Sequence, residues 1–344
     1  MSAVAEQKDF SGVNLAGFRI KTELGRGNNG VVYLARQLAL DREVALKILL
    51  PELAAEPGYV QSFLHEARLA ARLDHPNIVQ ALDAGEAPGG IYFFAMEYVP
   101  GTTLEEIRIH QPERISLRFI LDVSIQLADA LDYAWNSHRM IHGDIKPGNL
   151  LIREGDGVVK LADLGLARVS GSANSGEIMA TPMYVAPEVI EARQEKIGVV
   201  SDIYSFAVML YELAAGTAPF HGDTETLLHL HLETPPEPLL HSNPDLDPEF
   251  ALFIDRMLEK DPDRRPQSWF EVRQFLERTR ARLCPGNDSG TPLRRSPGQV
   301  RVLRPRWWEG VLRHPFQKLL ILLLLLLFVG MVALLLYITV LAFQ

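Results

Sequence analysis

The chain has 344 residues, of which 47% are apolar and 22% charged, and this is enough to bury the core of one two-lobed unit with a tail. The single cysteine, Cys284, has no partner for an intrachain disulfide, so nothing indicates an oxidising compartment. The net charge of −9 is uneven: residues 294–318 carry seven basic side chains and one glutamate, or +6, which leaves −15 on residues 1–293 and disfavours nucleic acid as a partner.

Residues 1–17 are expected to form a flexible N-terminus. The start MSAVAEQKDF lacks the basic and apolar stretches of a secretory signal, so the N-terminus is expected to stay in the cytoplasm. Regular structure is predicted from about residue 18.

The stretch LGRGNNGVVYLA, followed by EVALKILL, predicts a strand, a glycine-rich turn and two further strands. Gly25, Gly27 and Gly30 have the spacing of loops whose backbone N–H groups approach phosphates without an intervening side chain. An ordinary hairpin with a glycine-rich turn has the same sequence pattern. The dinucleotide-binding fingerprint also shares this pattern, although it requires a helix where VVYLA looks extended.

Two charged residues follow the glycine-rich turn. Lys47 ends the sequence VALK on the third predicted strand, and Glu66 lies in FLHEARLAARL, whose spacing predicts an amphipathic helix. For Lys47 alone, the alternative is a solvated lysine at a strand edge. The later sequence IYFFAMEYVPGTTL predicts a buried strand that ends at a Pro-Gly turn.

Two polar stretches come next. HGDIKPGNL contains Asp144, Lys146 and Asn149, and KLADLGLA places Asp163 after a short strand. Phosphoryl transfer needs positioning, metal-held phosphates and a carboxylate that orients the attacking hydroxyl. Each of these side chains alone is also typical of a turn or a cap. Unrelated loops are not expected to place all of these residues in this order after a glycine-rich turn.

With these residues the chain resembles the eukaryotic-like serine/threonine protein kinases, from about Phe18 to Leu276. The resemblance implies an α+β, two-lobed protein kinase-like fold with a small β-rich N-lobe at 18–97 and a large helical C-lobe at 102–278. It also implies a non-specific serine/threonine protein kinase that uses ATP and Mg²⁺ to phosphorylate protein substrates.

The resemblance assigns catalytic roles to residues at matching positions. Lys47 would hold the α- and β-phosphates, positioned by Glu66. Asp144 would be the catalytic base, and Lys146 would steady the γ-phosphate. Asp202 would bond back to the loop that carries the base.

The same resemblance implies a nucleotide site. Val32 and Ala45 would sandwich the purine ring, Met96 would flank the pocket, and backbone groups near Glu97 and Val99 would bond adenine. The implied nucleotide-binding residues are Leu24, Gly25, Arg26, Gly27, Asn28, Asn29, Gly30, Val32, Ala45, Lys47, Met96, Glu97 and Val99.

Metal ligands and a docking segment complete the implied site. Asn149 and Asp163 would bind Mg²⁺. ATPMYVAPEVI matches the segment on which a substrate peptide docks, with Thr181 near the base. Glu188 in Ala-Pro-Glu would pair with Arg265 in DPDRRP, an ion pair that is structural in either reading.

The chain departs from the family pattern at three places. Gly143 stands where many relatives have an arginine that a phosphorylated activation loop neutralises. Our hypothesis is therefore an active kinase whose loop, at about 166–181, becomes ordered without a phosphate. Asn28 and Asn29 replace the small and usually aromatic tip of the glycine loop, which predicts a flap that closes less firmly. Leu164 replaces the phenylalanine of Asp-Phe-Gly.

Two other functions stay open as alternatives. His-Gly-Asp also occurs in small-molecule phosphotransferases such as the aminoglycoside kinases, although Lys146, Thr181 and Ala-Pro-Glu favour protein substrates. A pseudokinase scaffold is the second alternative, and such a protein would normally lack one metal- or phosphate-binding group. The four histidines within 221–241 lack the cysteines and regular spacing of a metal site.

The C-terminal part predicts a membrane anchor. Residues 279–318 read as a basic tether rich in Pro, Gly and Arg. The 25 residues 319–343 carry no charge, and at about 1.5 Å per residue they exceed a hydrocarbon core of roughly 30 Å. They predict one C-terminal transmembrane helix; the alternative is a buried helix of a soluble core.

The orientation of this span follows from its flanks. The basic stretch, with Trp307 and Trp308 at interface depth, favours a cytoplasmic location for everything before the span. We therefore expect a single-pass membrane protein, anchored at its C-terminus, with the kinase domain in the cytoplasm. A dimer through the span stays open, although the span has no clear small-xxx-small face.

Overall fold

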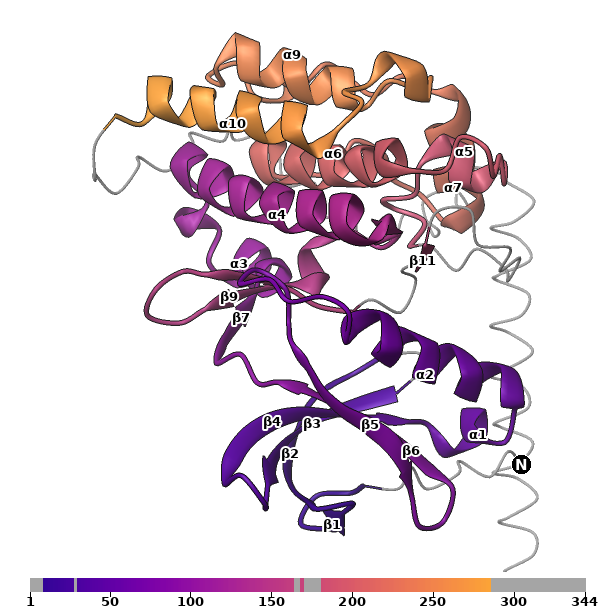
Figure 1. The fold of residues 1–344 in the computed structure, drawn as a ribbon. Helices are drawn as coiled ribbons and strands as arrows, with labels where there is room; N and C mark the ends of the chain where they lie inside the picture. The colour runs from indigo at the N-terminus through magenta and orange to yellow at the C-terminus, as the bar shows by residue number, and fades with distance from the viewer. Residues whose placement is uncertain (1–8, 28–29, 164–167, 170–180, 286–344) are drawn as a thin grey trace, which may run out of the picture. The chain divides into compact units, whose positions relative to one another are not determined.

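The computed structural model describes residues 9–27, 30–163, 168–169 and 181–285. These residues form a small lobe built on an antiparallel sheet and a large lobe built mainly of helices (Figure 1). The predicted two-lobed α+β fold is confirmed.

The small lobe is organised by one sheet of strand order β1-β2-β3-β4-β6-β5, in which neighbouring strands are antiparallel. The strands are β1 Asn14–Leu15, β2 Phe18–Arg26, β3 Gly30–Gln37, β4 Arg42–Leu49, β5 Ala81–Ala87 and β6 Ile91–Glu97. Along β3, Val31, Tyr33 and Ala35 are buried, whereas Val32 and Leu34 are only half-buried. Because side chains alternate along a strand, one face of the sheet forms the lobe's core and the other stays partly open.

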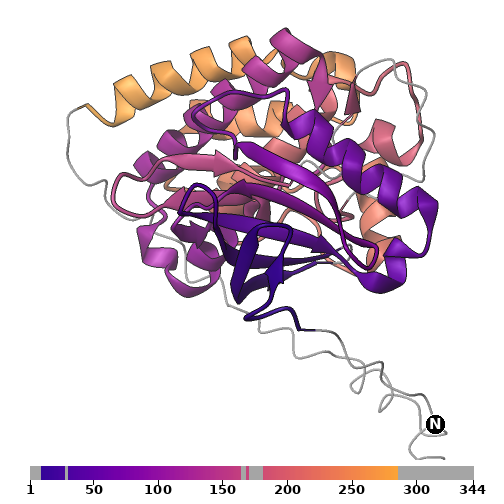
Figure 2. The same cartoon turned by 60° about the horizontal axis from the view of Figure 1, so that its bottom comes forward.

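Helix α2, Pro57–Ala70, lies beside this sheet and follows the short helix α1, Pro51–Ala54 (Figure 2). Its buried residues include Phe63 and Ala67. They belong to an apolar cluster that also contains other residues of α2, of the segment after it, of the sheet and of the large lobe, namely Leu49, Leu69, Ala70, Leu73, Ile78, Phe94, Ala130, Ala134 and Met140. This cluster fixes α2 against both lobes.

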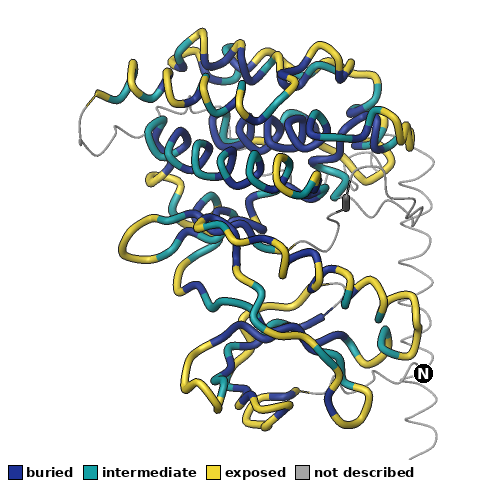
Figure 3. The backbone as a smooth tube through the Cα atoms, in the orientation of Figure 1, coloured by how far each residue is buried: buried dark blue, intermediate teal, exposed yellow. Residues whose placement is uncertain are grey.

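The large lobe contains the remaining elements. They are β7 Gly101–Thr103, α3 Leu104–His110, η1 Pro112–Arg114, α4 Leu117–His138, β8 Met140–Ile141, η2 Pro147–Asn149, β9 Leu150–Arg153, β10 Val159–Leu161, β11 Arg168–Val169, α5 Pro187–Ile190, α6 Val199–Ala215, α7 Thr224–Glu233, α8 Leu239–Ser242, α9 Pro248–Met257, η3 Pro262–Arg264 and α10 Trp269–Leu283. Helix α6 is apolar on nearly every side and is almost wholly buried (Figure 3). A helix of this kind forms the interior of a lobe, with amphipathic helices around it.

Local sequence signals set the ends of these helices. The Ser116 hydroxyl accepts a hydrogen bond from the Phe119 N–H and so caps the start of α4. Helix α6 ends at Gly216, which has a φ of 81°, a left-handed conformation that glycine adopts without strain.

The described fold continues on either side of residues 18–278. Phe10 and Leu15 are buried in the small-lobe core, and the Phe10 ring contacts the Tyr33 ring edge-on. Helix α10 continues to Leu283. Cys284 is half-buried and packs against the large-lobe core.

Within the described residues, no helix combines the length and apolarity that a bilayer crossing requires. The predicted span at 319–343 and most of the predicted tether lie outside the described residues.

Candidate active site

One face of the small-lobe sheet gathers four of the residues predicted to bind a nucleotide. Val32 on β3 is paired with Lys47 on β4, and Ala45 on β4 is paired with Met96 on β6. Directly opposed residues, and residues two apart on one strand, share a face. These side chains therefore line the partly open face, opposite the buried core that contains Tyr33.

The glycine-rich turn approaches this sheet closely at Gly30. A Cβ there would lie 2.6 Å from the Ile48 carbonyl oxygen, so only glycine fits beside β4. By contrast, a Cβ at Gly25 would have no described neighbour within 4 Å. Close packing against β4 therefore explains why a glycine is needed at Gly30, whereas the space beside Gly25 is open.

Lys47 is held by two carboxylates from different parts of the chain. Its ammonium lies 2.8 and 3.0 Å from the two oxygens of Glu66 on α2 and 3.3 Å from Asp163 Oδ1 in the large lobe. Desolvation alone would lower the pKa of Lys47, but the two carboxylates outweigh it and raise the pKa. The lysine is therefore charged at neutral pH.

Asp163 follows β10 and has a φ of 59°, which is uncommon for a residue other than glycine. Desolvation opposes its ionisation, but the Lys47 ammonium outweighs this effect and lowers the pKa of Asp163. Its side chain is 47% exposed. An ionised, accessible carboxylate is the state that a metal ligand needs.

A loop between β8 and β9 carries the predicted catalytic base, and α6 anchors it. The Asp202 carboxylate accepts hydrogen bonds from the N–H groups of His142 and Gly143, at 2.7 and 2.9 Å. Gly143 has a φ of 79°, where another L-residue costs about 1–2 kcal/mol. Glycine thus lets the chain turn without strain immediately before Asp144.

Asp144 lies at the centre of a tight polar group. Asn149 Nδ2 donates to the Asp144 carbonyl at 2.8 Å and to its Oδ2 at 3.0 Å. The Lys146 ammonium lies 2.6 Å from Oδ2. The Thr181 hydroxyl donates to Oδ1 at 2.6 Å and accepts from Lys146 at 2.9 Å.

This group also adjoins Asp163. The Ala162 N–H donates to the Asn149 carbonyl at 2.9 Å, and β10 pairs with β9 directly after Asn149. The segment that carries Asp144 and Asn149 and the segment that carries Asp163 are thus hydrogen-bonded neighbours. Chemically, the arrangement offers carboxylate and amide oxygens, two ammonium groups and a hydroxyl already bonded to a carboxylate.

A buried ion pair fixes the segment that follows Thr181. Arg265 donates to both oxygens of Glu188, at 2.8 and 3.0 Å, and the two side chains are 0% and 1% exposed. Ser201 on α6 donates to the same carboxylate at 2.7 Å. The pairing predicted for Glu188 and Arg265 is present.

Several charged side chains in the described part of the chain make contacts that the sequence did not predict. The Glu97 carboxylate, at the end of β6, lies 2.8 Å from the Lys160 ammonium of β10 and so joins the lobes. In the large lobe, Tyr184 donates to Glu212 at 2.7 Å, and Glu212 also lies 3.4 Å from Arg108. Since these partners lie more than 25 residues apart in the chain, no local pattern could have paired them.

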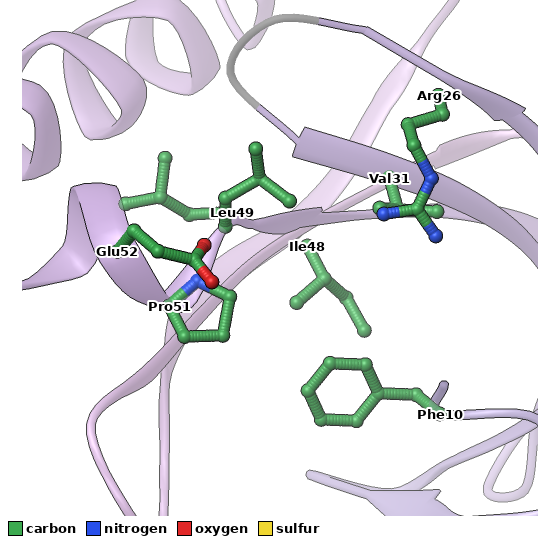
Figure 4. Close-up of a pocket in the computed structure, with 8 residues that line it drawn as sticks. Phe10, Arg26, Val31, Ile48, Leu49, Pro51 and Glu52 are labelled. Atoms are coloured by element: carbon green, nitrogen blue, oxygen red, sulfur yellow. The ribbon is translucent and has the colours of Figure 1, made fainter. Parts of the chain in front are cut away.

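Three further predicted nucleotide residues have different surroundings in the structure. The Arg26 side chain pairs with Glu23 and lines a separate small-lobe pocket beside Phe10 and Glu52 (Figure 4). Leu24 is 46% exposed. Val99 is buried just after β6. The predicted Asn28 and Asn29 lie outside the described residues, as does Leu164.

A comparison with known protein families shows to which family this site belongs. The profile of the protein kinase domain matches residues 18–277. The chain belongs to the protein kinase family. The family resemblance predicted from the sequence is therefore confirmed.

Two similar proteins are serine/threonine kinases of bacteria. PknB of Mycolicibacterium smegmatis is 36% identical over 271 residues, which are 76% of this chain and 43% of that protein. PknA of Mycobacterium tuberculosis is 35% identical over 290 residues, which are 82% of this chain and 65% of PknA. The chain thus matches less than two thirds of the length of either relative.

Solved structures of similar fold include a bacterial kinase domain. The PknI kinase domain of Mycobacterium tuberculosis aligns with a TM-score of 0.62 at 30% identity, over 78% of this chain and 98% of PknI. A structure described as the apo form of PpkA-294 aligns with a TM-score of 0.66 at 27% identity, over 77% of this chain and 98% of that one.

The histidines of this kinase domain do not gather as metal ligands. Among the described residues, no group of three or more histidine, cysteine, aspartate or glutamate side chains is arranged to hold a metal ion. His231 instead is fully buried on α7, bonded to the Tyr204 hydroxyl and the Met183 carbonyl. Burial lowers the pKa of His231 to about 4, with the Lys260 charge adding to the effect.

This lowered pKa predicts an acid-sensitive fold. Because the unfolded histidine has a pKa of about 6.5, it binds a proton before the folded one does. Stability contributed by neutral His231 is therefore complete above about pH 6.5 and is lost as the pH falls towards about 4. Between pH 7 and 4.5 the free energy of unfolding should fall by roughly 2 kcal/mol more in the wild type than in His231→Gln. Urea unfolding at both pH values measures this, and equal losses in the two proteins would contradict it.

Proposed function

We propose that the chain is an ATP-dependent, non-specific serine/threonine protein kinase. The observation that carries this proposal is the Thr181 hydroxyl, which donates to Asp144 at 2.6 Å while Lys146 donates to it. A carboxylate that already accepts from an aliphatic hydroxyl is suited to orient the hydroxyl of a substrate serine or threonine. The protein-kinase relatives support the same activity.

Lys47 and the half-buried face around it support an ATP site. Val32, Ala45 and Met96 offer a small apolar surface for a purine, and the charged Lys47 lies beyond them for the phosphates. The Glu97 side chain is occupied by Lys160, so its contact with adenine would be made by the backbone. The Arg26 side chain is likewise occupied, by Glu23, so its contact with the nucleotide would also be made by the backbone.

The donor set fits Mg²⁺, which prefers oxygen ligands. Asp163 offers an ionised carboxylate, and Asn149 uses its amide nitrogen for Asp144, which leaves the amide oxygen for a metal. When bound, the ion would neutralise charge on the phosphates. Lys47 and Lys146 would orient those phosphates, and Asp144 would hold the incoming hydroxyl.

One experiment separates this function from its alternatives. The 344-residue chain is incubated with γ-labelled ATP and Mg²⁺, with either a generic protein substrate or an aminoglycoside. Label on serine and threonine of protein supports the proposal. Label on the aminoglycoside alone selects a small-molecule phosphotransferase, and partner binding without any transfer selects a pseudokinase scaffold.

The loop at about 166–181 is proposed to work without phosphorylation. Gly143 brings no positive charge next to Asp144, and its left-handed backbone is held by Asp202 instead. No phosphate is then needed to neutralise a buried arginine.

Replacing Ser170, Ser172 and Ser175 together by alanine should leave transfer within about tenfold of the wild type, because the charge that a loop phosphate would neutralise is absent. The rate of label transfer to protein is the measurement. A loss of several hundredfold would reject phosphate independence.

The domain plan is proposed to be a cytoplasmic kinase domain, a basic tether and a C-terminal membrane helix at 319–343. The uncharged composition of that stretch and the basic residues before it support this plan. Deleting 319–343 should move the protein from the membrane fraction to the soluble fraction of a cell lysate. A deletion variant that stays with the membrane would exclude this stretch as the anchor.

A further inference from the structure

Helix α7 is attached to the Thr181 segment through one fully buried histidine. The two ring nitrogens of His231 lie 2.9 Å from the Tyr204 hydroxyl and 3.0 Å from the Met183 carbonyl. Since a carbonyl oxygen only accepts, Nε2 must donate to Met183, and Nδ1 accepts from Tyr204. His231 therefore bridges α6 and the backbone two residues after Thr181.

A lysine secures the C-terminal end of the same helix. The Lys260 ammonium donates to the carbonyls of Leu230 and His231, at 3.1 and 2.7 Å, near the end of α7. Terminal carbonyls of a helix lack partners within it and attract cations. The ammonium also lies 4.5 Å from the centre of the Phe220 ring.

Lys260 is itself joined to the buried ion pair. Arg265 donates to the Lys260 carbonyl at 3.1 Å and to Glu188. The segment from Thr181 to Glu188 is thus tied near one end by His231 and at the other by Arg265. Lys260 connects the two ties.

The segment tied in this way is the surface next to the acceptor hydroxyl. Thr181 touches Asp144, and an extended peptide advances about 3.3 Å per residue. The residues flanking a substrate serine or threonine must therefore pass over this backbone. The position of this backbone is therefore expected to affect protein substrates more than the nucleotide, whose base is proposed to lie against β3, β4 and β6.

We propose that His231 and Lys260 are positioning residues for the protein substrate: they lock α7 onto the Thr181–Tyr184 backbone and so determine the affinity for a polypeptide carrying the acceptor hydroxyl. This inference rests on the proposed kinase function. It assigns neither residue a contact with ATP.

The test compares His231→Leu with His229→Leu in the 344-residue chain. His229 is on the same helix, but its side chain is 64% exposed, so it is a matched control. His231→Leu removes the donor to the Met183 carbonyl and leaves the Tyr204 hydroxyl only the Lys260 ammonium, 3.4 Å away. The KM for a protein substrate should rise about tenfold or more, with the KM for ATP and kcat within about threefold. His229→Leu should change none of them.

Two further variants separate positioning from general damage. His231→Gln keeps an amide donor for Met183 and should recover part of the lost affinity, whereas Lys260→Met should raise the same KM without changing the KM for ATP. If His231→Leu does not fold, these two variants carry the comparison. A parallel rise in both KM values with a fall in kcat, or no change in any constant, would overturn the inference.

Hydrogen exchange gives a readout that does not depend on activity. The amides of residues 181–186 should exchange about tenfold faster in His231→Gln and Lys260→Met than in the wild type, because the segment loses a tie. Unchanged exchange would overturn the inference. Faster exchange in a protein that transfers no phosphate would uphold the attachment while rejecting the kinase function.

Discussion

Asp144→Asn should lower kcat for phosphoryl transfer to protein by roughly 10²–10⁴-fold, the usual contribution of a positioned acid or base. The amide has nearly the shape of the carboxylate, and the bond from Asn149 to the Asp144 carbonyl oxygen remains possible. What is lost is an anionic oxygen that accepts the hydroxyl proton. The dissociation constant of ATP should stay within about threefold. Steady-state kinetics and nucleotide binding measure the two effects.

Asp245→Asn is the matched control, because Asp245 is exposed and lies outside the site. It should leave both constants unchanged. Wild-type kcat in Asp144→Asn would mean that this carboxylate does not orient the acceptor. An equal loss in Asp245→Asn would point to a general effect of removing charge.

Arg265→Ala should reduce the free energy of unfolding by about 3–5 kcal/mol. The substitution leaves the Glu188 carboxylate buried without its cation, and it removes the donors to the carbonyls of Glu259, Lys260 and Val200. Breaking a buried pair on one side costs much more than removing an exposed pair, because the remaining charge cannot reach water. Urea unfolding at pH 7 measures this loss.

The neighbouring Arg264 provides the control. It pairs with Glu259 at 3.0 Å but is 66% exposed, so Arg264→Ala should cost less than about 1 kcal/mol. Replacing Glu188 and Arg265 together by apolar residues should cost less than the sum of the two single changes, because neither charge is then left alone. Equal losses for Arg264→Ala and Arg265→Ala would show that burial of the pair has no bearing on stability.

The sequence predicted those parts of the site that depend on local pattern. Alternation along β3 and β4 puts Val32, Ala45 and Lys47 on one face, and the amphipathic helix around Glu66 turns that carboxylate towards the sheet. The short loop from Asp144 to Asn149 brings its polar groups together by chain length alone. The two-lobed fold followed from the family resemblance.

Other parts could not be predicted because they depend on tertiary contacts. The contact between Lys160 on β10 and Glu97 joins residues that are distant in the sequence, so no local pattern indicated it. His231 was one of four histidines near each other in sequence, and only its tertiary contacts with Tyr204 and Met183 distinguish it from the exposed His229.

The account depends most on Lys47, Asp163, Asn149 and Asp144 acting together on one metal-bound nucleotide. A crystal structure with Mg²⁺ and a nonhydrolysable ATP analogue tests this most directly. The account predicts metal bound by oxygens of Asn149 and Asp163, the inner phosphates at Lys47, and the outermost phosphate beside Lys146 and Asp144. A nucleotide bound elsewhere, or an absence of metal and nucleotide from these residues at saturating concentrations, would contradict it.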